Sequence, residues 1–171
     1  MTSRRTNLRI AAAIFAVIGM VLALFCGTTL SGNISGMNVV YKVNHLMLGP
    51  SKITSIVGTG SASVSVTYYL SNQPSYLLLI AFILAFVSLI VFLSTAYSNP
   101  GNATLLAFLS LIIIASGVVF LFSKDIALTT VSLYEKSLND FKVEFIGLII
   151  AGVSFILSGV LSLISAFVQE Y

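Results

Sequence analysis

Four long stretches of this sequence contain no acidic residue, no basic residue and no histidine, and this feature limits the possible folds most strongly. They are roughly Ile10–Leu30, Tyr76–Ser98, Ala103–Phe122 and Phe145–Val168. Because a helix rises 1.5 Å per residue, about 20 apolar residues cross the hydrocarbon core of roughly 30 Å. We therefore expect an all-α membrane protein, with four transmembrane helices in a single membrane domain over residues 1–171.

The composition excludes an ordinary soluble protein. Charged residues make up 8% of the chain and hydrophobic residues 58%, whereas about 25% of a soluble chain is charged. If the four stretches were buried core helices, polar segments would have to cover them, and the chain has too few. The lipid bilayer is therefore the expected environment. Nucleic acid is not an expected partner, because no basic stripe interleaved with aromatic residues is present.

The arginines Arg4, Arg5 and Arg9 precede the first apolar stretch and indicate the orientation. Short cytoplasmic segments are enriched in Lys and Arg, so we expect the N-terminus on the cytoplasmic side of the cell membrane. Four crossings return the C-terminus to that side. The lysines of the expected outer segments count against this orientation: Lys42, Lys52, Lys124, Lys136 and Lys142. The compact arginine cluster carries more weight in our interpretation.

Two further features concern how the helices begin and connect. The basic start could also belong to a cleaved signal peptide, but the apolar stretch is longer than a usual signal core, so we expect an uncleaved first helix. The second and third stretches are joined by Asn99-Pro100-Gly101-Asn102. Pro and Gly favour a tight turn, which predicts an antiparallel helical hairpin.

The outer segment 31–75 has the patterns of β-strands. Apolar and polar residues alternate over Val39–Asn44 and Ala62–Leu70, Ile53–Val57 is a short β-prone run, and Ser31–Gly36 reads as a loop. We predict a small extracytoplasmic antiparallel sheet of two or three strands between the first and second helices. The sheet is either a structural lid or, through its edge, a pairing surface for another chain.

The second outer segment, 124–142, has the pattern of an amphipathic helix. Its apolar residues recur at spacings of 4, 3, 4 and 3, which places them on one helical face. They are Ala127, Val131, Tyr134, Leu138 and Phe141.

Small residues recur inside the spans with a period near 3.5. In the first span they are Ala12, Ala16, Gly19 and Ala23, followed by Gly27. In the fourth they are Gly147, Ala151, Ser154, Ser158, Ser162 and Ser165, with Gly152, Gly159 and Ala166 as a second row. Small side chains let helices approach closely in lipid, and this period predicts a left-handed bundle with crossing angles of about 20°. We hypothesise that one row of the fourth span packs within the bundle and the other against another protomer or subunit. The alternative is that Gly and Ser are simply common in membrane helices.

Residues for catalysis or metal binding are scarce. His45 is the single histidine and Cys26 the single cysteine, so neither has a companion at ligand spacing. We read His45 as a strand residue and Cys26 as a small packing residue. The outer carboxylates alternate with lysines and are typical of a solvated helix face: Asp125, Glu135, Asp140 and Glu144. We expect no catalytic site, no metal and no cofactor.

These observations favour a non-enzymatic multi-pass membrane protein that acts through helix packing and assembly into homo- or hetero-oligomers with other membrane proteins. The alternative is a passive channel or transporter component. A proton-coupled pump is disfavoured, because the spans carry no ionisable residue. The layout resembles that of claudin-like tetraspan proteins in topology, but this chain has no Trp and one Cys, so it lacks the tryptophan and paired cysteines of that family's first loop.

Overall fold

The computed structural model contains four long helices, α1 (Arg4–Phe25), α2 (Tyr76–Ser98), α3 (Ala103–Leu121) and α5 (Ile146–Phe167). It describes residues 4–34, 37–43, 46, 51–57, 64–70, 75–98, 102–123, 125–126 and 142–168. By length and composition, all four helices can cross a membrane. The predicted number of apolar helices is therefore confirmed.

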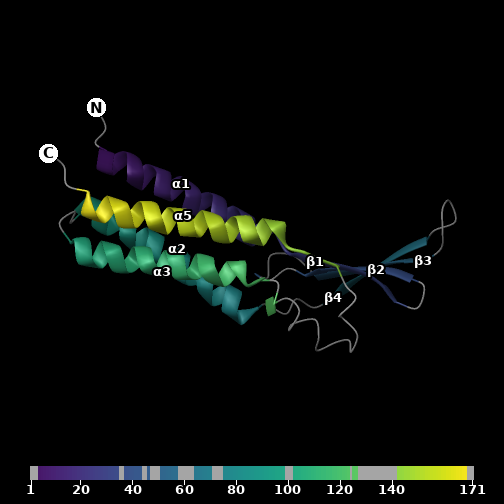
Figure 1. The fold of residues 1–171 in the computed structure, drawn as a ribbon. Coiled ribbons are helices and arrows are strands. Elements are labelled where there is room, and N and C mark those ends of the chain that lie inside the picture. The colour runs from purple at the N-terminus through teal and green to yellow at the C-terminus, as the bar shows by residue number, and fades with distance from the viewer. Residues whose placement is uncertain are drawn as a thin grey trace.

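The helices form an elongated bundle in which α5 packs most extensively against α3 and α1. α2 packs on α3 and has far less contact with α1. Both chain termini lie at one end of the bundle, and a β-sheet lies beyond the other end (Figure 1). We call these the terminal end and the sheet end.

The interior of the bundle holds small side chains together with a few large ones, such as Phe92, Phe120 and Phe155, whereas most large apolar side chains lie on its outside. Ala16, Ala85 and Ala151 are fully buried, whereas Ile14, Ile80 and most other large apolar side chains of the helices remain exposed. This distribution suits a bundle in lipid, where large apolar side chains need no burial and close helix contacts come from small residues. The left-handed crossing of the helices stays a prediction.

The sheet has five antiparallel strands: β1 (Thr28–Ile34), β2 (Met37–Val43), β3 (Ser51–Val57), β4 (Val64–Leu70) and β5 (Lys142–Glu144). Their order is β4-β3-β2-β1-β5. The predicted small antiparallel sheet is confirmed, but two or three strands was too few. It is also not formed only between the first two helices, because β5 follows α3 in the chain.

Two boundaries predicted around β1 were wrong, and both errors have one cause. The first helix was expected to run to Leu30, and Ser31–Gly36 was expected to be a loop. In the structure, α1 already ends at Phe25. Instead β1 begins at Thr28 and pairs with β2 on one side and β5 on the other. Hydrogen bonds to β2, the next strand in the chain, and to β5, which follows α3, therefore override the local preference of this stretch.

The amphipathic helix predicted over 124–142 lies largely outside the described residues. At its start, the N–H groups of Asp125 and Ile126 donate to the carbonyl of Phe122, which continues α3 by a turn. At its end, Lys142 lies in strand β5 and not in a helix.

Candidate functional site

The predicted small residues of the first span lie at the interface between α1 and α5. Ala12, Ala16 and Ala23 are each 1% exposed. A Cβ atom added at Gly19 would lie 3.1 Å from the carbonyl oxygen of Ala151 and 3.1 Å from the ring of Phe155. The two backbones therefore approach as closely as small residues permit.

Gly147 continues the same interface at the sheet end of the bundle. A Cβ atom at this position would lie 2.5 Å from both Cβ and Sγ of Cys26, which is closer than real contacts allow. Cys26 is a free, partly buried thiol. Its contact with Gly147 is the kind that a small packing residue makes.

The second row of α5 faces α3 of the same chain. A Cβ atom at Gly152 would lie 2.8 Å from the carbonyl oxygen of Gly117, and one at Gly159 would lie 2.5 Å from Ile114 and 2.8 Å from the carbonyl oxygen of Ser110. Both rows of α5 thus contact neighbouring helices of one chain. The hypothesis that the second row faces another protomer loses the observation on which it rested.

The buried serines hydrogen-bond within their own helices where a bond is seen. Ser110 donates to the carbonyl of Leu106, and Ser165 donates to the carbonyl of Ser162. Ser154 and Ser158 are buried in α5, and the Ser158 hydroxyl has no hydrogen-bond partner among the described residues. The contribution of these serines to packing is therefore chiefly their small size.

Two arginines of α1 bind the last turns of neighbouring helices at the terminal end. Nε of Arg5 donates to the carbonyl oxygen of Ser165 on α5 at 3.1 Å, and Nη1 of Arg9 donates to that of Ala96 on α2 at 2.8 Å. The last four carbonyls of a helix have no partner within it, and a positive charge there is favourable. Arg5 and Arg9, two of the arginines predicted to set the orientation, therefore also link α1 to α5 and α2.

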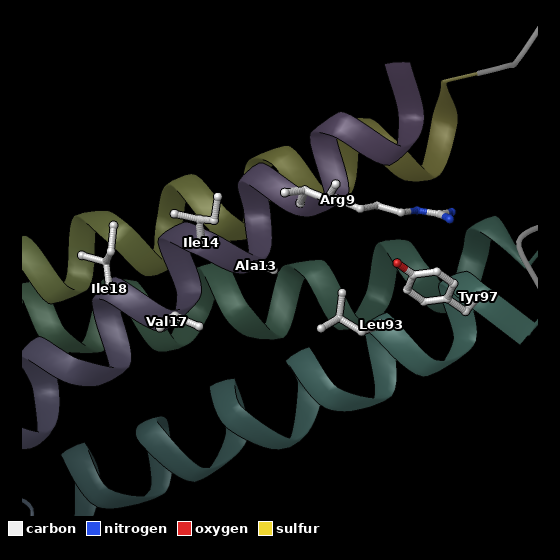
Figure 2. Close-up of a pocket in the computed structure, with 8 residues that line it drawn as sticks. Arg9, Ala13, Ile14, Val17, Ile18, Leu93 and Tyr97 are labelled. Atoms are coloured by element: carbon white, nitrogen blue, oxygen red, sulfur yellow. The ribbon is translucent and has the colours of Figure 1, made fainter. Parts of the chain in front are cut away.

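A groove lies where α1 and α2 have little contact (Figure 2). It is an open groove with a volume of about 440 Å³, lined by α1 from Arg9 to Ile18 and by Leu93 and Tyr97 of α2. Its walls are apolar except at the terminal end, where Figure 2 shows Arg9 and Tyr97. Sequence reasoning missed this groove, because it depends on how two helices separated in the chain diverge.

The sheet is joined to the bundle by two short links. Cys26 and Gly27 alone separate α1 from β1, and Phe145 alone separates β5 from α5. Strands β1 and β5 pair antiparallel, with Leu30 opposite Val143, just as α1 and α5 pack antiparallel. The α1–β1 and β5–α5 segments therefore run together from the bundle into the sheet (Figure 1).

The two charged residues of β5 form a surface ion pair. Nζ of Lys142 lies 2.9 Å from a carboxylate oxygen of Glu144, and both side chains are exposed. The hydrogen bond and the charge of Glu144 raise the pKa of Lys142 above its usual 10.5. In the part of the chain that the structure describes, no three His, Cys, Asp or Glu residues come together as a metal site. His45, Glu135 and Asp140 lie outside that part.

Comparison with protein-family models and with curated proteins gives no match for this sequence. The class that the fold defines is therefore a coarse one: a protein with four helices able to cross a membrane and a small antiparallel sheet at one end of them.

Proposed function

We propose that this chain is a non-enzymatic multi-pass protein of the cell membrane, whose helix bundle holds an extracytoplasmic sheet in place for contact with another membrane protein. The observation that carries this proposal is the double link between sheet and bundle. Because β1 and β5 pair where α1 and α5 pack, the sheet cannot rotate freely about a single connection. A fixed sheet can present a binding surface without the entropy cost of ordering it.

The orientation belongs to the same proposal. Arg4, Arg5 and Arg9 lie at the terminal end, whereas β2 with Lys42 and β5 with Lys142 lie at the sheet end. The arginine cluster supports a cytoplasmic terminal end and an extracytoplasmic sheet.

β4 supports the choice of the sheet as the contact surface. Among the strands that the structure describes, it lies at the edge, because β3 is its one neighbour in their order. Edge strands commonly avoid pairing with other chains through charged residues or proline. The sequence of β4, VSVTYYL, contains neither. Val66 is also exposed on β4. We infer that the partner binds at this edge.

Purification of the tagged full chain from native membranes, followed by identification of co-purifying proteins, tests the proposal. We expect a stoichiometric membrane protein partner that Val66→Lys releases. Lys142→Ala, on the opposite edge strand, is the matched control and should retain it. The absence of a partner would contradict the proposal. Ion flux through the purified chain in liposomes would instead support the alternative, a passive channel. The close packing of Gly19 on Ala151 argues against that alternative.

A further inference from the structure

The strands of the sheet have a defined direction relative to the helix bundle. Cys26 and Gly27 alone separate α1 from β1, so β1 runs away from the bundle, and the sheet extends beyond the bundle roughly along its long axis (Figure 1). Each strand from β1 to β4 is antiparallel to the next. β4 therefore runs back toward the bundle, where α2 begins at Tyr76 shortly after β4 ends at Leu70.

This direction decides how two copies of the chain can pair through β4, which lies at the edge of the described strands. Two copies in one membrane are related by a twofold axis along the membrane normal, and hence along their strands. Their β4 strands would be parallel, and one sheet would be turned over relative to the other. Two copies in facing membranes are inverted, so their β4 strands can pair antiparallel with both sheets in the same sense. This second arrangement continues the pattern of the described sheet, in which every strand pair is antiparallel.

The sequence of β4 is complementary to itself in the antiparallel arrangement. A pair centred on Thr67 uses all seven residues of the strand and places each residue opposite one from the same face. It puts Val66 opposite Tyr68 of the second copy, and the two Thr67 residues opposite each other. Pairs of a β-branched with an aromatic residue, and pairs of two threonines, are favourable across antiparallel strands. The apolar positions of β4 therefore meet one another: Val64, Val66, Tyr68 and Leu70.

The charge and the size of this contact also suit many copies in facing membranes. In a pair of identical strands every charge occurs twice, and like charges across a strand pair are destabilising. β4 contains no charged residue, so a second copy meets no such repulsion at this strand. One contact of seven residues from each chain is small, and a lone pair of strands is only marginally stable. Facing membranes engage many such contacts at once, which raises the overall affinity.

We propose that β4 binds β4 of a second copy of this chain in a facing membrane, so that the two sheets join edge to edge into one continuous antiparallel sheet. This inference rests on the proposed function, and it names the membrane protein that binds at the edge of β4 as the chain itself. The protein that co-purifies with a tagged chain is then its untagged copy.

Single cysteines in a Cys26→Ala background test the register, after the full chain is reconstituted in liposomes and oxidised with copper phenanthroline. In the proposed pair the two Cα atoms of position 67 are about 4.5–5.5 Å apart, within the range of about 4.4–6.8 Å that a disulfide requires. The two Cα atoms of position 65 are four residues apart along the strand, about 14 Å. We expect Thr67→Cys to form a disulfide-linked dimer and Ser65→Cys, its matched control, to form none. Ser65→Cys mixed with Tyr69→Cys should form one, because these positions are opposite each other.

Two tags of different size on Thr67→Cys show which membranes the pair joins, when each tagged chain is reconstituted in separate liposomes that are then mixed. We expect dimers that carry both tags. Adding Val66→Lys should abolish them, and adding Lys142→Ala should leave them unchanged. Dimers that carry a single kind of tag would overturn the proposal. So would equal cross-linking of Ser65→Cys and Thr67→Cys, because two copies in one membrane keep every residue level with its own counterpart.

A disulfide within the chain is the control for folding. Ser31→Cys with Lys142→Cys, which are opposite each other in β1 and β5, should form it in the same liposomes. If this internal disulfide forms and Thr67→Cys gives no dimer, the pairing of β4 with its copy is wrong. If a different membrane protein then co-purifies with the chain and Val66→Lys releases it, the proposed function is still supported. If no partner co-purifies either, both proposals are wrong.

Discussion

Gly117 of α3 and Gly152 of α5 each lie against the carbonyl oxygen of the other. A Cβ atom at Gly117 would be 2.7 Å from the oxygen of Gly152, and a Cβ atom at Gly152 would be 2.8 Å from the oxygen of Gly117. Both distances are below 3.0 Å, so no larger residue fits at either position without moving a backbone. This reciprocal contact lets α3 and α5 form the most extensive helix pair of the bundle.

Replacing Gly152 with leucine should therefore destabilise the folded chain itself. Overpacking of an interior typically costs 1–3 kcal/mol, and we expect about 2 kcal/mol or more here, because the obstacle is backbone. Thermal unfolding in detergent measures the loss. Val153→Leu is the matched control, because Val153 is next to Gly152 in the chain and its side chain is exposed. This variant should change stability by less than about 0.5 kcal/mol. A Gly152→Leu variant that keeps its stability but no longer self-associates would contradict this prediction. It would indicate that the row of Gly152 and Gly159 lies between protomers.

The contact between Gly147 and Cys26 allows a test by exchange. Gly147→Ala should destabilise the chain by about 1–3 kcal/mol, because its Cβ would overlap with Cys26. Cys26→Gly removes the atoms that cause the overlap, so the double variant should recover part of the loss. A double-mutant cycle of thermal unfolding measures this coupling, expected at about 0.5–3 kcal/mol. Purely additive effects would show that the two residues do not meet.

The arginines at the helix ends should contribute to stability as well as to orientation. Arg5→Gln removes the cationic donor from the last turn of α5, and the expected loss is about 0.3–1 kcal/mol, with up to about 2 kcal/mol for a partly buried site. Arg4→Gln is exposed and should change the melting temperature little. Equal melting temperatures for Arg5→Gln and Arg4→Gln would show that the hydrogen bond of Arg5 to Ser165 contributes nothing measurable to stability.

The ion pair of β5 predicts how stability responds to alkaline pH. Because Glu144 raises the pKa of Lys142 in the folded chain, the contribution of the pair is present below the usual lysine pKa of 10.5. It is lost only as the pH rises through the higher value of the folded state. The difference in melting temperature between the wild type and Lys142→Gln should therefore be the same at about pH 7 and about pH 9. A difference that disappears within this interval would contradict the direction of the pKa shift.

The sequence predicts the bounds of a helix best where the residues that end the helix are next to it in the chain. The range predicted for the second span, Tyr76–Ser98, coincides with α2, because the apolar run of the sequence ends there and a proline, which disfavours helix at the residue before it, follows two positions later. The start of α1 was predicted too late, since hydropathy sets the arginines apart from the apolar run. Arg4 to Arg9 are helical all the same, and from that helix Arg5 and Arg9 reach the ends of α5 and α2.

The remaining differences come from the partners of each segment, which its own residues do not specify. Ser31 and Gly32 have no strand pattern of their own, yet they lie in β1. Both pair with β2, and Ser31 also pairs with Lys142 of β5. The small residues of α5 were identified from their spacing, but their spacing does not name the helices that they face. Gly117 gave no such signal, since a single glycine in an apolar run is common in membrane helices.

Labelling of single cysteines in intact cells tests most directly that these helices cross the membrane and place the sheet outside. In a Cys26→Ala background, Lys42→Cys lies on β2 at the sheet end, and Asn102→Cys lies at the start of α3 at the terminal end. We expect a membrane-impermeant maleimide to label Lys42→Cys in intact cells and Asn102→Cys only after permeabilisation. Labelling of both positions in intact cells, or of neither, would contradict a bundle that separates the two ends by a bilayer.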